Sequence, residues 1–370
     1  TEEEQRTFTF IESLKHKFTE DNLRNATFLP RSYWQFDQKK KYSETTLYGS
    51  ERLENDKMNQ YCSFVQSRRY CDAVNHDREW HSLHLDDGSV PGQALTQFLS
   101  AFPENNDTVI AFVGDSTTSD FFYALACASM RAESLGRLTV NAKSCKILLN
   151  GFEQICVEFE NRRVLLAVKE RWTADPHDFE LIVTEAKRKI DLLVLNFGTH
   201  YHRKQANKMQ NDTDAVLEYL VSDEALVKVA AIIVQGTVPQ NFDVEGGQYD
   251  TMTSARQKEA RNMAQNRSCK SGASYYDEEK GGVWREHVWM RATEKVSSLR
   301  LIPYISMAYL NSLTNSHPDS RCERTWPAEI WIKDRSCFFA LDCTHVCYSN
   351  FVYEPLLRRT VDALQLTSSH

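Results

Sequence analysis

The chain has 370 residues with a formal net charge of −7, and 41% of its residues are apolar. This length allows two or three domains or one large α/β domain, and the apolar fraction is enough for a buried core. No apolar run reaches the roughly 18 residues of a membrane-spanning helix, so none is predicted here. Acidic residues outnumber basic ones, which argues against nucleic acid as a partner, because phosphate contacts need clustered Lys and Arg.

Cysteines and glycosylation sequons indicate the cellular compartment. The ten cysteines are an even number, and four Asn-x-Ser/Thr sequons accompany them. Together they favour a secretory-pathway protein with disulfide bonds, the alternative being a cytosolic protein with scattered thiols. The disulfide candidates are Cys62, Cys71, Cys127, Cys145, Cys156, Cys269, Cys322, Cys337, Cys343 and Cys347, and the glycosylation candidates are Asn25, Asn106, Asn211 and Asn266.

The chain begins Thr-Glu-Glu-Glu, with neither Met nor an apolar signal-peptide segment. We therefore expect a mature or trimmed luminal portion, with a signal peptide or a membrane anchor outside the given residues. Residues 1–100 are polar and aromatic-rich and have few periodic runs.

From residue 100 onward, short apolar runs alternate with helix-like stretches. Continuous runs rich in β-branched residues predict strands buried on both faces of a parallel sheet. These runs cover residues 108–113, 145–149, 163–168, 190–196 and 229–234, and the predicted helices cover 120–132, 179–189 and 212–220. The alternation predicts a doubly wound α/β fold: a mainly parallel sheet flanked by helices, with ligands beyond the C-terminal strand ends. Residues 249–282 are polar and predict a long surface excursion.

Gly114-Asp115-Ser116 directly follows the first predicted strand. A strand that ends in this triplet and leads into a helix places the Ser116 hydroxyl at the C-terminal edge of the sheet. The Ser116 backbone N–H then lies at a helix N-terminus, where an oxyanion is stabilised. A plain turn of the same composition is the alternative.

Asp342 and His345 form an Asp-x-x-His pattern near the other end of the chain. A carboxylate at this spacing can reach the Nδ1 side of the imidazole within one short turn, which leaves Nε2 free to accept a serine proton. The alternatives are a solvated surface histidine or a zinc knuckle of Cys343, His345 and Cys347. The customary zinc partner pairs C-x₂-C and H-x₃-H are absent from the sequence.

Asn196 ends the most strand-like segment, and its amide is a candidate oxyanion donor, although Asn-x-Gly is also a common turn. One other group of residues suggests a metal site, but its spacing matches no motif, so we expect a polar surface loop there and no metal. That group is His76, His81, His84, Asp86 and Asp87.

The order Gly-Asp-Ser, Asn and Asp-x-x-His resembles the SGNH (GDSL-type) hydrolase superfamily. Within it, the block 342–347 and the stretch 353–364 are similar to the PC-esterase, trichome-birefringence-like branch. Residues 238–247 and 159–167 resemble further segments of that branch. The likeness spans roughly residues 100–365, and it departs from the family at Val346, where a Trp is usual.

The resemblance implies an SGNH-like α/β/α catalytic domain over residues 101–370, with the lobe 1–100 packed on it. It also implies a serine-dependent O-acetyltransferase or acetylesterase that acts on carbohydrate O-acyl groups, in the Golgi lumen or secreted. The expected triad is Ser116, His345 and Asp342. The oxyanion donors are Ser116, Asn196 and a glycine, for which we take Gly151, with Gly136 as the alternative.

Arg171 and His200 are candidate contacts to the carbohydrate, and the seven tryptophans include candidate sugar-stacking platforms. No cofactor is expected beyond an acyl donor such as an acetyl thioester or an acetylated sugar. Two other functions stay open. One is a non-catalytic glycan-binding protein that keeps the fold, and the other is a lipid or small-ester hydrolase.

Overall fold

The computed structural model describes residues 93–134, 138–140, 149–186, 188–240, 281–307, 321–324, 340–346 and 350–368. Its strands are β1 (Asp107–Gly114), β2 (Thr139–Val140), β3 (Glu153–Phe159), β4 (Arg162–Glu170), β5 (Leu192–Asn196), β6 (Ile232–Gln235), β7 (Tyr304–Ile305), β8 (Arg321–Arg324) and β9 (Ala340–Val346). Its helices are α4 (Gln93–Ser100), α5 (Ser116–Ser134), α6 (Pro176–Glu185), α7 (Ala206–Leu220), α8 (Asp223–Leu226), α10 (Val283–Ser297) and α13 (Asn350–Ser368), with a 3₁₀ turn at Arg203–Gln205.

The first seven of these strands form one mixed, mostly parallel sheet in the order β2-β3-β4-β1-β5-β6-β7. Strand β1 pairs in parallel with β4 on one side and with β5 on the other, and the parallel pairing continues through β6 to β7. Strands β3 and β2 extend the β4 edge by antiparallel pairing. A separate two-stranded sheet joins β8 to β9.

This architecture confirms the predicted mostly parallel α/β fold. The apolar runs at 108–113, 163–168, 190–196 and 229–234 fall on β1, β4, β5 and β6. Every residue of β5 is buried, as expected for a strand covered on both faces. The predicted helices fall on α5, α6 and α7, with ends that differ by a few residues.

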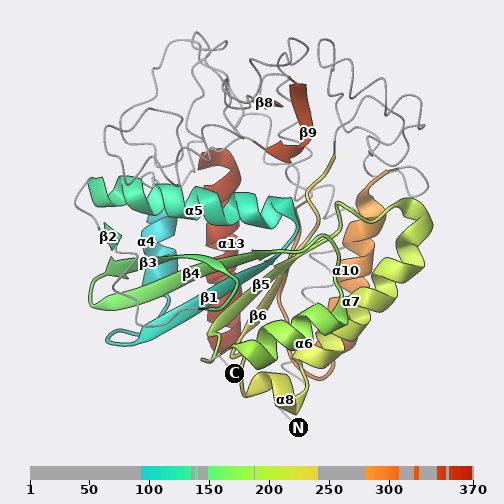
Figure 1. Ribbon diagram of the computed structural model, residues 1–370, viewed down its shortest axis with the longest axis horizontal. Coiled ribbons are helices and arrows are strands. Elements are labelled where there is room, and N and C mark those ends of the chain that lie inside the picture. The colour runs from blue at the N-terminus through green and yellow to red at the C-terminus, as the bar shows by residue number, and fades with distance from the viewer. Residues whose placement is uncertain are drawn as a thin grey trace.

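Helices cover both faces of the sheet (Figure 1). On one face, α4, α5 and α13 contribute side chains to a cluster with alternate residues of β1 such as Ile110 and Phe112. On the other face, α6, α7 and α10 pack on the intervening residues, including Val109 and Ala111. The twofold alternation of a strand thus assigns neighbouring β1 residues to two separate cores.

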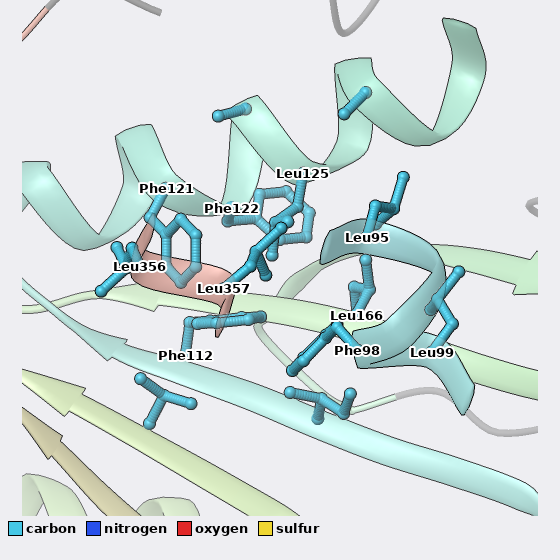
Figure 2. Close-up of a cluster of buried hydrophobic side chains, with 14 of the residues drawn as sticks. Leu95, Phe98, Leu99, Phe112, Phe121, Phe122, Leu125, Leu166, Leu356 and Leu357 are labelled. Atoms are coloured by element: carbon cyan, nitrogen blue, oxygen red, sulfur yellow. The ribbon is translucent and has the colours of Figure 1, made fainter. Parts of the chain in front are cut away.

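Figure 2 shows the first of these clusters at close range. Phe112 of β1 and Leu166 of β4 lie beneath side chains from α4, α5 and α13. In the same cluster the Phe98 and Phe102 rings meet edge to face, with their centroids 5.4 Å apart. Helix α4 therefore belongs to the core of the α/β unit, although the sequence prediction assigned residues up to 100 to an accessory lobe. The remainder of that lobe, residues 1–92, lies outside the described residues.

Candidate functional site

Ser116 is the first residue of α5 and follows the C-terminal end of β1. From β1 the chain enters α5 on one face of the sheet, whereas from β5 it continues to α7 on the opposite face. The ends of β1 and β5 therefore form a topological switch point, the place where open α/β sheets bind ligands. Two of the predicted site residues lie at this switch point, because Asn196 ends β5 beside the end of β1.

Gly114 makes the approach of these two strand ends possible. It pairs with Asn196 across the β1–β5 register. A Cβ atom built on Gly114 would lie 1.9 Å from the Asn196 carbonyl oxygen and 2.1 Å from the Thr118 hydroxyl. Only glycine fits this position, because a side chain would push β5 away from the turn that carries Ser116.

Asp115 fixes the turn between β1 and α5. Its carboxylate is buried and accepts hydrogen bonds from the Thr117 backbone N–H at 3.0 Å and from the Thr117 hydroxyl at 2.6 Å. The Thr199 backbone N–H donates to the other carboxylate oxygen at 3.2 Å, as does the Thr199 hydroxyl. Asp115 is therefore the N-cap of α5 and also ties the loop after β5 to the Ser116 turn.

Asn196 bridges the switch point with both its backbone and its side chain. Its carbonyl oxygen accepts from the Asp115 backbone N–H at 3.0 Å, and its side-chain oxygen lies 3.4 Å from the Thr117 hydroxyl oxygen, whose proton bonds to the nearer Asp115 carboxylate. Its amide nitrogen donates to the Gly236 carbonyl at 3.1 Å. A primary amide has two N–H groups, and this bond uses one of them.

A buried carboxyl group from α10 lies beside the end of β6, at the same edge of the sheet. A Cβ atom on Gly236 would lie 2.4 Å from Oε1 of Glu286, which α10 contributes and which is fully buried. The Tyr304 hydroxyl donates to the other oxygen of this carboxyl. Burial raises the pKa of Glu286 to about 8, although Ser306, the Met307 backbone and Arg359 act to lower it. Sequence reasoning missed Glu286, since a Glu in a helix is usually solvated.

The two residues predicted to contact carbohydrate have different surroundings. The Arg171 guanidinium pairs with the Asp178 carboxylate at 2.9 Å and donates to the Glu170 carbonyl at 3.1 Å. His200 is exposed, and its imidazole stacks on the Trp172 indole with the ring centroids 5.4 Å apart and the planes inclined by 16°. Sequence reasoning did not single out Trp172, which is 67% exposed.

Gly151, the predicted oxyanion glycine, lies in the turn before β3 and has a φ of +70°. Because β3 runs antiparallel to β4, this turn lies at the C-terminal edge of the parallel strands. One strand, β4, lies between β3 and β1 in the sheet. The alternative glycine, Gly136, lies outside the described residues.

Asp342 and His345 both lie in β9, in an extended backbone rather than the short turn expected from their spacing. The register of the β8–β9 pair shifts between Arg321 and Cys322. Arg321 pairs with Val346, whereas Cys322 pairs with Asp342. Figure 1 draws β9 on the side of the sheet at which β1 ends. The side chains of Asp342 and His345 lie outside the described residues, so their part in a triad stays a prediction.

Of the predicted covalent features, Cys156 of β3 is buried and takes part in a disulfide bond. Asn106 is exposed in the turn before β1, and Asn211 is exposed on α7. The sequons at Asn25 and Asn266 and the histidine-rich group 76–87 lie outside the described residues. Within the described ranges, no helix is long and apolar enough to cross a membrane, and no three His, Cys, Asp or Glu side chains gather as metal ligands would.

Comparison with known proteins finds no family model that matches the chain and no match among curated proteins.

Proposed function

We propose that the protein is a serine-dependent acyl-ester enzyme, an O-acetyltransferase or acetylesterase that acts on carbohydrate O-acyl groups. One observation carries the proposal: the Ser116 turn and the Asn196 amide meet at the switch point of a mostly parallel sheet. The resemblance of the Gly-Asp-Ser, Asn and Asp-x-x-His segments to SGNH hydrolases supports the same reaction.

In this proposal the Ser116 hydroxyl attacks the ester carbonyl as His345 accepts its proton, and Asp342 holds the imidazole in the required tautomer. The acyl group is then bonded to Ser116, and the sugar oxygen leaves with the proton that His345 returns. In the next step water or a second sugar hydroxyl attacks the acyl-serine as His345 accepts its proton. The bond between the acyl group and the Ser116 oxygen then breaks, and His345 returns the proton to that oxygen. Attack by water gives hydrolysis, and attack by a sugar hydroxyl gives transfer.

Negative charge on the carbonyl oxygen during each attack requires donors that are already in place. The Ser116 backbone N–H belongs to the first turn of α5, where the helix dipole favours an anion. The second N–H of the Asn196 amide adds a donor from β5, and Gly151 is the proposed third. Each such donor contributes roughly 3–4 kcal/mol in acyl-transfer sites of this kind.

The test replaces Ser116 with Ala and measures both fluorophosphonate labelling and acetate release from acetylated xylo-oligosaccharides. The matched control is Ser119→Ala, which removes another serine hydroxyl from the start of α5, one that donates to Glu170. We expect Ser116→Ala to abolish labelling and to lower turnover by at least about a thousandfold. We expect Ser119→Ala to retain both.

Full activity in Ser116→Ala would refute the proposed nucleophile. A wild-type chain that binds glycans but resists fluorophosphonate would refute the enzyme and support the non-catalytic glycan-binding function.

A further inference from the structure

Trp172 is unusual for its exposure. Most large aromatic side chains in the described ranges lie in the two cores, whereas Trp172 leaves 67% of its surface accessible. The other large apolar residues exposed in those ranges are aliphatic: Leu181, Val227 and Leu299. Most of the indole surface therefore contributes nothing to the two cores and is accessible to a ligand.

The indole is held in one orientation. Its ring lies nearly parallel to the His200 imidazole, which covers one indole face at a centroid distance of 5.4 Å. Stacking between rings restricts the rotation of both side chains, so the accessible face of Trp172 is already in place before a ligand arrives.

Both ring-bearing loops are tied to the turn that carries Ser116. The Arg171 backbone N–H, one residue before Trp172, donates to the Gly114 carbonyl at 2.6 Å. The Thr199 backbone N–H, one residue before His200, donates to Asp115 at 3.2 Å. The stacked pair therefore lies on the same edge of the sheet as Ser116 and is fixed relative to it.

The neighbours of the pair decide which ligand fits. Glu170, Arg171 and Asp178 surround this loop with charged groups, and an apolar acyl chain or lipid tail would remove water from them at a cost. A pyranose ring offers a flat C–H face to the indole and a rim of hydroxyls to the charged groups. A carbohydrate can contact the apolar indole face and hydrogen-bond to the charged side chains, whereas a lipid tail can contact only the indole face.

We propose that Trp172, backed by His200, is the platform on which a pyranose ring of the substrate stacks beside Ser116. This inference rests on the proposed function for the identity of the reacting ester. It assigns sugar recognition to an indole, and it assigns the Arg171 guanidinium to an ion pair that shapes the loop.

The experiment titrates the full chain with cellotetraose, xylotetraose and chitotetraose at millimolar concentration and records binding by calorimetry. We expect at least one tetrasaccharide to bind, and Trp172→Ala to weaken that binding by about threefold to tenfold. Trp172→Phe keeps an aromatic face and should recover part of the affinity. Leu299→Ala is the matched control, because it truncates an exposed apolar residue before β7, at the opposite edge of the sheet.

Hydrolysis of 4-nitrophenyl acetate separates this inference from the proposed function, because that ester carries no sugar. We expect the wild-type chain to hydrolyse it and Ser116→Ala to fail to do so. Absence of this hydrolysis together with Trp172-dependent sugar binding would overturn the enzyme and leave the platform standing. Unchanged binding in Trp172→Ala, or no binding of any tetrasaccharide to the wild-type chain, would overturn the platform.

Discussion

Glu286 gives the stability of this protein a defined dependence on pH. Burial raises the pKa of its carboxyl from the ordinary value of 4.5 to about 8, so the folded chain keeps a proton that the unfolded chain loses between these values. Stability linked to Glu286 is therefore complete below pH 4.5 and falls as pH rises toward 8. At about 1.4 kcal/mol per pH unit, the loss is roughly 3 kcal/mol by pH 7 and roughly 5 kcal/mol above pH 8.

The perturbation is Glu286→Gln. Glutamine is neutral, has the same shape as glutamate and can still accept a hydrogen bond from the Tyr304 hydroxyl. Urea denaturation with disulfides intact, repeated at each pH from 5 to 9, gives the free energy of unfolding of both chains. We expect the free energy of unfolding of the variant, relative to that of the wild type, to rise by about 1.4 kcal/mol for each unit of pH up to about 8. Above that pH the difference should stay constant. The slope is diagnostic, because a different hydrogen-bonding energy of glutamine would shift all points equally.

The control is Glu294→Gln, which removes the same formal charge from an exposed position of α10. Any effect of net charge on the profile appears in both variants, so only a slope confined to Glu286→Gln reports the buried carboxyl. A difference between wild type and Glu286→Gln that stays constant from pH 5 to 9 would refute the reasoning.

Two further substitutions test the site and the core. Asp115→Ala removes the α5 N-cap and the tie to Thr199, and we expect it to cost roughly 2–3 kcal/mol by urea denaturation; no measurable loss would contradict the bracing role. Phe98→Ala empties a fully buried position where α4 meets the core, and we expect a loss of roughly 3–5 kcal/mol in the same assay. An unchanged stability would show that α4 is not part of the α/β unit.

Four of the seven strands of the sheet could be predicted from the sequence because they are buried on both faces. Each such strand requires an uninterrupted apolar run, and the runs at β1, β4, β5 and β6 are unmistakable in the sequence. Strand β7 consists only of Tyr304–Ile305 and contains too little pattern to detect. Helix α10 was missed for a different reason: its buried face includes Arg285 and Glu286, so an apolar period does not emerge.

The positions of Ser116 and Asn196 could be predicted because parallel strands end at a common edge. The capping role of Asp115 follows from its place in this motif, since a carboxylate directly before a helix readily accepts hydrogen bonds from first-turn N–H groups. Its link to Thr199 could not be predicted, because that hydrogen bond joins residues 84 positions apart in the chain. Local spacing carries no information on such a contact.

The same distinction explains why Trp172 was overlooked while His200 was not. His200 lies close to the Asn196 motif in the sequence, whereas Trp172 comes four residues after Val168, where the β4 pattern has already ended. Only the parallel pairing of β4, β1 and β5 places both loops on one edge, and only then do the two rings stack. An exposed residue in a loop adds nothing to the hydrophobic periodicity by which strands and helices are predicted. Exposed aromatic residues of this kind therefore have to be located from the strand order and not from the motifs.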